Sequence, residues 1–281
     1  MAELTLEHVS YIYGERTPFE ITALDDVSLT VREGSVTGII GHTGSGKSTL
    51  VQLLNGLEKP ASGRVLLDGC DIWEKPKEMQ KIRFRIGLVM QYPEYQLFEE
   101  TVSADISFGP RNMGLTEEEI KARVSEAAQF VGLEPETMEK SPFDLSGGQK
   151  RRVAIAGVMA MRPEVLVLDE PAAGLDPRGR DMILKGIREY GRCTGNTVVI
   201  VSHSMEDMAA YCDDIIVMAG GKVHLCGSRD AVFAHATELA KVGLDIPQIT
   251  KLALLLKQRG ITIPEGIYTV EAAVEALRPL F

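Results

Sequence analysis

The pattern of apolar and polar residues predicts two kinds of β-strand. Up to about residue 68, the segments 4–9 and 27–31 alternate apolar and polar residues, which is typical of strands that bury one face. Later in the chain, 165–168 and 197–201 are apolar throughout, which favours parallel strands buried on both faces. These patterns predict an α/β protein in which an antiparallel β-subdomain comes before a parallel sheet.

Helical patterns separate the two groups of strands. Between about 93 and 161 the strand signals fade, Thr116 and Glu119 form a capping box, and Gly132 is suited to end the helix that follows. The apolar residues that share one face of this helix are Ile120, Val124, Ala127 and Val131. A second helix over 179–190 would connect the two late strands. We therefore expect a helical subdomain inserted over about 93–161.

The last part of the chain, 227–281, has a different character. It contains helical segments rich in alanine and leucine, interrupted by Pro247 and by 260–264, with a last short helix from Thr269. An apolar stripe is formed by Ile249, Leu252, Leu255 and Leu256. Such a stripe more often belongs to a core than to an interface, but on an appendage to a complete core it could bind a partner subunit.

A glycine-rich segment follows the apolar run 36–40 and leads into a helix. It consists of Gly41, His42, Thr43, Gly44, Ser45, Gly46, Lys47 and Ser48, with Thr49 as the next residue. The apolar positions at helical spacing after it are Leu50, Leu53, Leu54 and Leu57. Strand, loop and helix in this order are the context of a P-loop, whose backbone N–H groups cradle phosphates. Lys47 would reach the β and γ phosphates, and Ser48 would bind Mg²⁺.

A second glycine-rich segment, 145–149, predicts another helix start. Its residues are Leu145, Ser146, Gly147, Gly148 and Gln149, and Ser146 and Gln149 have the spacing of a capping box. The two glycines leave backbone N–H groups uncovered, so an anion could approach the positive end of the helix dipole. Alone, the segment would more often be an ordinary helix start; beside a P-loop, it favours a second phosphate-binding device.

Several polar residues follow predicted strands at the carboxyl edge of the sheet, where ligands of open α/β folds bind. Asp169 ends the run 165–168, and a carboxylate there is favoured if it helps to hold Mg²⁺. Glu170 could act as the base or orient the attacking water. His203 could bond to the γ-phosphate, and Gln91 could contact Mg²⁺ or the water. Near the N-terminus, the ring of Tyr11 or Tyr13 could face an adenine, although packing is the commoner role.

Charge and cysteine content narrow the function classes. Forty acidic and thirty basic residues among 281 leave a formal charge of −10, which argues against binding nucleic acid. Four cysteines lie far apart without a CxxC pair, so neither a zinc site nor a disulfide framework is expected. No apolar stretch approaches the roughly 20 residues that span a bilayer. A role in a membrane process would therefore require a partner.

With these motifs in order, residues 1 to about 230 resemble an ABC transporter ATP-binding subunit. The resemblance implies an A-loop aromatic (Tyr13), Walker A (41–48), a Q-loop (Gln91), the signature (145–149), Walker B with a catalytic Glu170 (165–170), a D-loop (174–176) and a switch His203. It implies ATP and Mg²⁺ as cofactors and a RecA-like P-loop NTPase core. Ser146 and Gly148 of one subunit would close over ATP on Lys47 of another, and Asp176 would communicate across the seam.

Three stretches resemble one branch more closely, the energy-coupling factor vitamin importers. These are 41–47, 91–98 and 151–157. The segments 13–20 and 170–176 look like the second of that branch's two ATPase types. The resemblance implies an ABC domain over 1–226 and a helical extension over 227–281 for ATPase pairing. It also implies a paralogous ATPase partner, with a homodimer left open. A transmembrane scaffold subunit and a substrate-binding membrane subunit would hold the pair at the cytoplasmic face of a prokaryotic cell membrane.

Other classes of P-loop protein share some of these motifs. The ATPase of a cobalt, nickel or other ABC importer would carry the same motifs. A soluble ABC ATPase acting on DNA or the ribosome usually has two cassettes or a long coiled-coil insertion, and this chain has neither. An ordinary P-loop kinase gives no reason for the segment 145–149. The transport function is therefore preferred.

Overall fold

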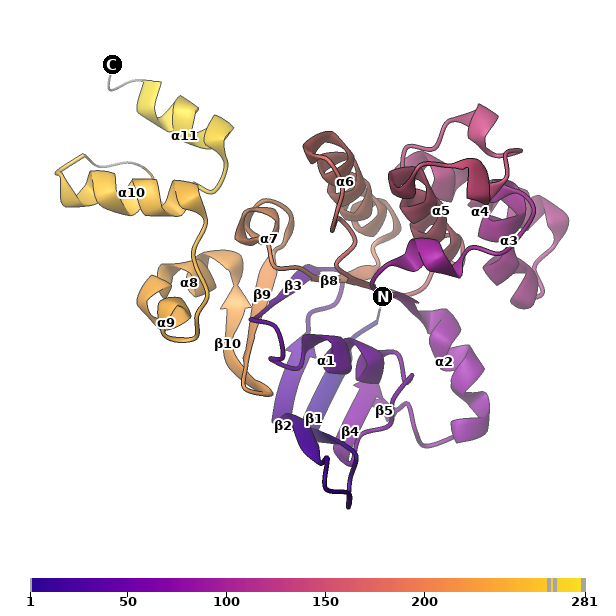
Figure 1. Ribbon diagram of the computed structural model, residues 1–281, viewed down its shortest axis with the longest axis horizontal. Coiled ribbons are helices and arrows are strands. Elements are labelled where there is room, and N and C mark those ends of the chain that lie inside the picture. Colours follow the sequence, from indigo (N-terminus) through magenta and orange to yellow (C-terminus); the bar gives the residue numbers. More distant parts are fainter. Residues whose placement is uncertain (1, 262–263, 265–266, 279–281) are drawn as a thin grey trace.

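The computed structural model describes residues 2–261, 264 and 267–278, which form an α/β fold with two sheets (Figure 1). The antiparallel sheet has the order β2-β1-β4-β5, and the larger sheet has the order β10-β9-β3-β8-β7-β6. The strands are β1 (Leu4–Tyr13), β2 (Ile21–Val31), β3 (Val36–Ile40), β4 (Ser62–Leu67), β5 (Cys70–Asp71), β6 (Ile86–Val89), β7 (Val165–Asp169), β8 (Thr197–Val201), β9 (Asp214–Ala219) and β10 (Lys222–Ser228). The predicted fold class is confirmed.

The helices lie mainly in the second half of the chain and in the segment between β6 and β7. The α-helices are α1 (Lys47–Leu54), α2 (Met79–Arg85), α3 (Val102–Asn112), α4 (Glu117–Phe130), α5 (Gly147–Met159), α6 (Pro177–Thr194), α7 (Met205–Tyr211), α8 (Arg229–Ala234), α9 (Ala236–Lys241), α10 (Gln248–Gln258) and α11 (Val270–Leu277). Short 3₁₀ turns are η1 (Pro76–Glu78), η2 (Pro93–Gln96), η3 (Pro135–Thr137) and η4 (Pro142–Asp144). Among the described residues, no helix is both long and apolar enough to cross a membrane.

The larger sheet owes its parallel core to strands that are apolar on both faces. Strands β9, β3, β8, β7 and β6 pair in parallel, and only β10 at the edge is antiparallel to its neighbour. Every residue of β3, β7 and β8 is buried, as the apolar runs predicted. Burying one such valine or isoleucine side chain contributes about 1.5–3 kcal/mol. Their parallel direction brings the carboxyl ends of these strands to one edge.

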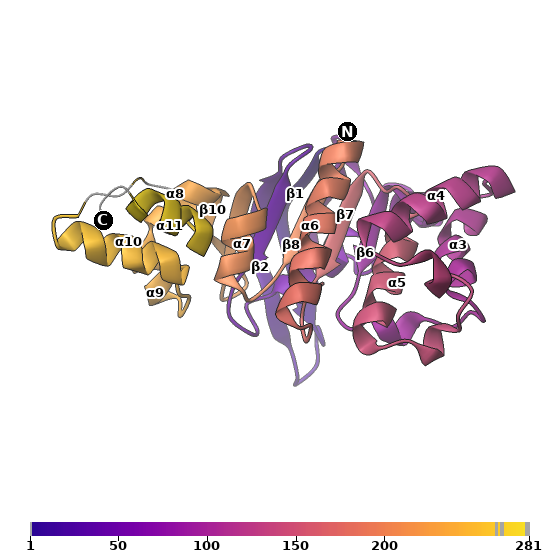
Figure 2. The same ribbon diagram turned by 90° about the horizontal axis from the view of Figure 1, so that it is seen from above.

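A helical subdomain interrupts the larger sheet between two neighbouring strands. Strands β6 and β7 are paired, yet α3, α4 and α5 all lie between them in sequence. The capping box of Thr116 and Glu119 is present, and the four apolar residues predicted to share a face of α4 are all buried. Figure 2 shows α3–α5 at one end of the molecule and α8–α11 at the other, with the sheets between them.

Helix α1 packs between the two sheets but is shorter than the leucine spacing indicated. Leu50, Leu53 and Leu54 are buried in the core shared by both sheets. The helix ends at Leu54 because Gly56 adopts a left-handed conformation (φ +67°) and Leu57 N–H turns back to the carbonyl of Gln52. The prediction that Leu57 continues the stripe is wrong, since it lies beyond the helix and is 41% exposed.

Helix α6 is longer at both ends than the predicted 179–190. Asp176 caps its N-terminus by accepting a hydrogen bond of 2.6 Å from Gly179 N–H, and Pro177 occupies the first turn. Gly195 ends the helix. The helix therefore begins directly at the segment 174–176.

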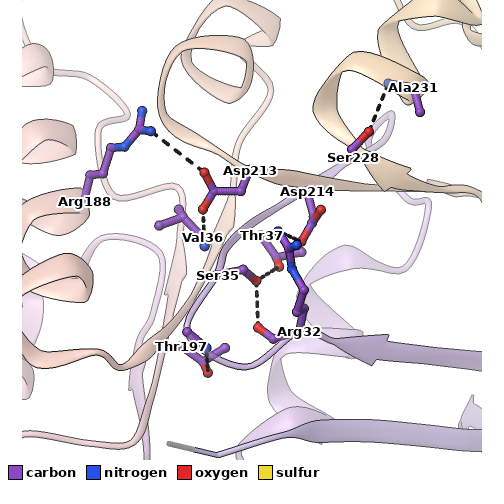
Figure 3. Close-up of polar contacts among 11 residues, drawn as sticks. Arg32, Ser35, Val36, Thr37, Arg188, Thr197, Asp213, Asp214, Ser228 and Ala231 are labelled. Carbon is purple, nitrogen blue, oxygen red and sulfur yellow. Dashed lines mark hydrogen bonds and ion pairs between the residues drawn. The ribbon is translucent and has the colours of Figure 1, made fainter.

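At the amino ends of the parallel strands, opposite their carboxyl ends, side chains hold the start of β3 in place (Figure 3). Asp213 accepts a hydrogen bond of 3.0 Å from Val36 N–H through Oδ2, and its own N–H donates to the Val36 carbonyl at 2.7 Å. Arg188 of α6 lies 3.8 Å from the same carboxylate. Arg32 pairs with the adjacent Asp214 at 2.9 Å. These contacts anchor the strand that leads to the glycine-rich loop.

The C-terminal helices extend from the end of the sheet, with α8 starting directly after β10. The predicted boundary at 226/227 falls inside β10, two residues before it ends at Ser228. Helix α10 has no buried residue, and Leu255 in its stripe is 56% exposed. The core interpretation of the stripe is therefore wrong. In the predicted interruption, residues 262–263 lie outside the described residues; the last helix follows Thr269 as expected.

Candidate functional site

The glycine-rich loop connects β3 to α1 and lies tightly against neighbouring backbone. A Cβ atom at Gly41 would lie 2.4 Å from both the carbonyl oxygen of Met218 and Oγ of Ser45, so a larger residue cannot fit. Ser45 is fully buried, and its Oγ has no hydrogen-bond partner among the described residues. His42, Thr43 and Gly44 are exposed. The loop therefore presents an open backbone surface on a rigid base.

Lys47 places a cation at the start of α1. Its Nζ donates hydrogen bonds to the carbonyl oxygens of Gly41, at 2.7 Å, and His42, at 2.9 Å. Burial lowers the pKa of Lys47, while the nearby carboxylates of Glu170 and Asp169 oppose this shift. The ammonium group is thus held within the loop by carbonyl groups. An anionic ligand bound there would stabilise this buried positive charge.

Ser48 and Asp169 bring two oxygen ligands together from α1 and β7. The Ser48 hydroxyl lies close enough to the Asp169 carboxylate to affect its ionisation. Burial raises the pKa of Asp169, and the neighbouring Ser48 hydroxyl and the charge of Lys47 lower it in part. Hydroxyl and carboxylate oxygens are the ligands that Mg²⁺ prefers, so this donor set fits that ion.

Glu170 is an acidic residue held in an unusual conformation. Its φ of +53° is rare for a residue with a side chain, and its N–H is bonded to the Val201 carbonyl at 3.0 Å. Oε1 is buried and has no hydrogen-bond partner among the described residues. His203 Nε2 lies 3.2 Å away, but the contact is not aligned as a hydrogen bond. A buried, unpaired oxygen is costly, so it is suited to accept a proton from a ligand or water.

The pKa values of both Glu170 and His203 are shifted by their surroundings. Burial, and then the charge of Asp169, raise the pKa of Glu170 to about 7. Burial, and then the charge of Lys47, lower the pKa of His203, so its imidazole is neutral at pH 7. A glutamate that titrates near neutral pH is suited to general base chemistry. The structure therefore joins Lys47, Asp169, Glu170 and His203, as the strand ends predicted, into one cluster that we call the carboxyl edge.

Two other predicted residues lie at the margins of this cluster. Gln91 lies two residues after β6, and its exposed side chain is not hydrogen-bonded to any of the described residues. The Tyr13 hydroxyl lies 3.2 Å from Oγ1 of Thr49 on α1, and its ring packs edge-on against Tyr11 at 4.8 Å. Tyr13 as a residue is 41% exposed.

The segment 145–149 forms a separate feature on the helical subdomain. Ser146 caps α5: its Oγ accepts from Gln149 N–H at 3.3 Å, and Gln149 Oε1 accepts from Ser146 N–H at 3.1 Å. A surface hollow is lined by Ser146, Gly148, Gln149, Arg152, Gly174, Leu175, Asp176, Arg178, Gly179, Met182 and Ile183, and we call it the signature hollow. No residue of 41–49 lines it. The structure therefore does not join the segment to its own glycine-rich loop.

One ion pair near the carboxyl edge was not anticipated from the sequence. Arg180 on α6 binds Asp207 on α7 through both carboxylate oxygens, at 2.9 and 2.8 Å from Nε. The charge of Asp207 also adds to the raised pKa of Glu170. These residues are 27 positions apart, and no local pattern pairs them. Only the packing of α6 against α7 shows that the helix after Asp176 and the helix after His203 are linked.

Comparisons with known proteins agree with this geometry. The ABC transporter family matches residues 24–173. The energy-coupling factor transporter ATP-binding protein EcfA2 of Caldanaerobacter subterraneus subsp. tengcongensis is 54% identical over 272 residues, which cover 97% of this chain and 95% of that protein. EcfA2 of Clostridium tetani is 52% identical over 279 residues, with 99% of this chain and 97% of that protein covered.

A solved structure has the same architecture. The structure of cbiO1 from Clostridium perfringens, part of the ABC transporter complex cbiONQ, superposes with a TM-score of 0.76 at 41% identity and covers 90% of this chain and 98% of that chain. The chain belongs to the ABC transporter family and, within it, to the energy-coupling factor transporter ATP-binding proteins.

Proposed function

We propose that this chain is the ATP-hydrolysing subunit of an energy-coupling factor importer that takes up a vitamin or another micronutrient through transmembrane partners. The observation that carries the proposal is the carboxyl edge. There, a buried and unpaired Glu170 oxygen lies close to the Ser48–Asp169 pair and Lys47. This arrangement provides a cation, metal ligands and a base at the end of one sheet.

The glycine-rich loop and its neighbours form the nucleotide site in this proposal. The backbone N–H groups of 44–47 bind the phosphates, and Lys47 moves from its loop carbonyl partners to the β and γ phosphates. Ser48 and Asp169 would hold Mg²⁺, with Gln91 as a further ligand. When bound, Mg²⁺ neutralises charge that develops on the phosphate oxygens. Tyr13, which is exposed, stacks its ring on the adenine.

Glu170 acts on the attacking water. Its unpaired Oε1 accepts a hydrogen bond from the water, and the carboxylate takes up the water's proton as the oxygen bonds to the γ-phosphorus and the bond to the β-phosphate oxygen breaks. His203, neutral at pH 7, donates a hydrogen bond to a γ-phosphate oxygen. The raised pKa of Glu170, about 7, makes its carboxylate a more effective base than an ordinary glutamate.

A second subunit completes each nucleotide site in this proposal. The signature hollow contains Ser146, Gly148 and Asp176 but no residue of the chain's own P-loop, which supports its role as half of a site on a neighbouring subunit. The dimeric ATP-binding cassette MJ0796 bound to ADP and Pi, which superposes with a TM-score of 0.73 at 30% identity, supports such an assembly. We propose a paralogous ATPase as the partner, with a homodimer as the alternative.

The remaining surfaces are assigned to the other subunits. The ATP-binding domain extends to the end of β10 at Ser228, with the helical subdomain over about 93–161, and the helices after β10 form the extension that pairs the two ATPases. The absence of buried residues in α10 supports this pairing role. The segment after Gln91 contacts a transmembrane scaffold subunit, which a substrate-binding membrane subunit accompanies. The chain then lies at the cytoplasmic face of the prokaryotic cell membrane, without nucleic acid as a partner.

The substitution Glu170→Gln tests the proposed function. It keeps the shape of the side chain but removes the base, so hydrolysis by the membrane complex falls by about 10²-fold or more, while ATP still induces association of the two ATPases. Phosphate release measures the first effect and sedimentation the second. Glu189→Gln, at an exposed position of α6, serves as the control and retains wild-type turnover. Wild-type turnover in Glu170→Gln would exclude this residue as the base.

A second candidate function uses the same site. The ATPase of a cobalt, nickel or other ABC importer has the same hydrolytic chemistry, and the similar cbiO1 structure is part of a cbiONQ complex. Purifying the complex from detergent-solubilised membranes and identifying its subunits distinguishes the two. A soluble complex associated with nucleic acid would instead support a non-transport ABC ATPase.

A further inference from the structure

Arg151, two residues after the signature segment, is a charged side chain in the interior of the protein. Only 3% of the residue is exposed. Its guanidinium donates two hydrogen bonds to the Glu94 carboxylate, from Nε to Oε2 at 3.1 Å and from Nη2 to Oε1 at 3.0 Å. The remaining nitrogen, Nη1, donates to the carbonyl oxygen of Ala173. The Tyr92 ring lies 6.0 Å from the guanidinium carbon.

These partners come from three different segments of the chain. Glu94 belongs to η2, just after Gln91. Arg151 itself belongs to α5, which Ser146 caps. Ala173 lies in the turn between Glu170 and Asp176, and its N–H is bonded to the Glu170 carbonyl at 3.2 Å. A single side chain thus joins the segment after Gln91, the signature helix and the turn after the proposed base.

The energetics make this junction hard to break while the protein stays folded. A buried guanidinium that loses its carboxylate partner is left as an uncompensated charge, which is strongly unfavourable. Bidentate pairing also fixes the relative orientation of the two groups, which lysine cannot reproduce. A displacement of η2 must therefore move α5 or the turn at Ala173 with it.

The surface of η2 offers a place where such a displacement could begin. Tyr95 is 84% exposed, and Tyr92 next to Gln91 is 51% exposed. Tyr92 is held at φ +57°, a conformation that is rare for an aromatic residue. The outer side of η2 therefore faces solvent, whereas its inner side is tied to Arg151 through Glu94.

We propose that Arg151 is a positioning residue that couples η2 to the signature segment and to the turn after Glu170. The coupling rests on the proposed function, because it gives a partner at η2 a route to the nucleotide site. By linkage, it is reciprocal: a nucleotide that orders the turn at 170–173 also orders η2. Arg151 touches neither the nucleotide nor the reacting atoms in this proposal.

Hydrogen–deuterium exchange of the full chain tests the coupling in the Glu170→Gln background, where ATP with Mg²⁺ persists. We expect ATP with Mg²⁺ to slow exchange at 44–50 and, by about fivefold or more, at 92–98. Adding Arg151→Lys or Glu94→Gln reduces the effect at 92–98 to less than about twofold and leaves that at 44–50 unchanged. Arg162→Gln removes a surface ion pair with Glu126 as the control and changes neither.

The outcomes separate this inference from the proposed function. No ATP-dependent change at 44–50 in the parent protein refutes the nucleotide site itself. Protection at 44–50 without protection at 92–98, or full protection at 92–98 in both Arg151→Lys and Glu94→Gln, overturns the coupling. If both variants lose slow exchange throughout the sheet without ATP, Arg151 serves folding alone, and the proposal also fails.

Discussion

The carboxyl edge and the signature hollow differ in how they are built, although both present glycine-rich helix starts. At the carboxyl edge, Asp169 ends β7, while Lys47 and His203 come after β3 and β8, and each of the three shifts the pKa of another. In the signature segment, Ser146 and Gln149 satisfy each other within a single turn. The carboxyl edge thus requires several strands of the sheet, whereas the capped helix start at Ser146 forms within one turn. In the proposed function, this helix start binds the nucleotide of another subunit.

The largest effect should come from removing the cation of the carboxyl edge. Lys47→Ala leaves the phosphates without their buried counter-charge, so ATP binds about 100-fold more weakly or worse. Equilibrium binding of a fluorescent ATP analogue to the isolated chain measures this. Lys81→Ala, which removes an exposed lysine of α2, is the control and binds as the unmodified chain does. Equal affinity in Lys47→Ala and the control would show that the Lys47 ammonium group does not bind the phosphates.

The matching change in the signature hollow should leave ATP binding intact. Ser146→Arg fills the hollow with a bulky charge, and ATP-induced dimer formation weakens by about tenfold or more. The affinity of the same chain for ATP stays within about twofold, because no residue of 41–49 lines the hollow. Analytical ultracentrifugation with the partner ATPase measures the dimer, and Thr116→Arg is the matched control at the other capping box. Unchanged dimerisation would remove the hollow from the assembly.

A pH profile tests the coupling of charges at the carboxyl edge. Glu170 must be ionised to accept a proton, and its pKa is about 7, so hydrolysis falls about tenfold for each pH unit below 7. The folded pKa lies above the ordinary value of 4.5, so the ionisation also lowers folded stability as pH rises from about 4.5 to 7. Glu170→Gln removes this loss of stability, which thermal unfolding between pH 5 and 8 measures. A rate that stays flat down to pH 5.5 would contradict the shift.

The smallest expected effect comes from substituting the N-cap residue of each of the two capping boxes. Ser146→Ala and Thr116→Ala each remove an N-cap hydrogen bond and should lower the free energy of unfolding by about 1 kcal/mol. Urea unfolding measures both. Only Ser146→Ala should also weaken ATP-induced dimerisation, because Thr116 caps α4 away from the hollow. Equal effects of both substitutions on the dimer would mean that capping alone explains the role of Ser146.

Local patterns predicted some parts of the molecule well and others poorly. The buried strands and the capping boxes were predicted because they depend on residues close in sequence. The end of α1 was not predicted, because the helical spacing of Leu57 suggested a longer helix. The left-handed conformation of Gly56 ends the helix before Leu57. The stripe on α10 was ambiguous because periodicity shows an apolar face but not what covers it.

Pairs that join distant segments could not be predicted at all. Arg180 with Asp207, and Arg151 with Glu94, are side-chain contacts across 27 and 57 positions. Charged residues on a helix are usually solvated, so the sequence offers no reason to expect either pair to be partly or wholly buried. Their partners depend on which helices pack together.

The sequence by itself determined the chemical groups of this protein and the order in which strands and helices present them. Gly41 to Ser48, Asp169, Glu170 and the capping box at Ser146 follow from local spacing and hydrophobic patterns. Only the tertiary structure decided that Glu170 is buried with an unpaired oxygen, and that Arg151 reaches both Glu94 and Ala173. The reason is physical: local hydrogen bonds and side-chain periodicity act within a few residues, whereas desolvation and charge pairing depend on every segment that packs around a group.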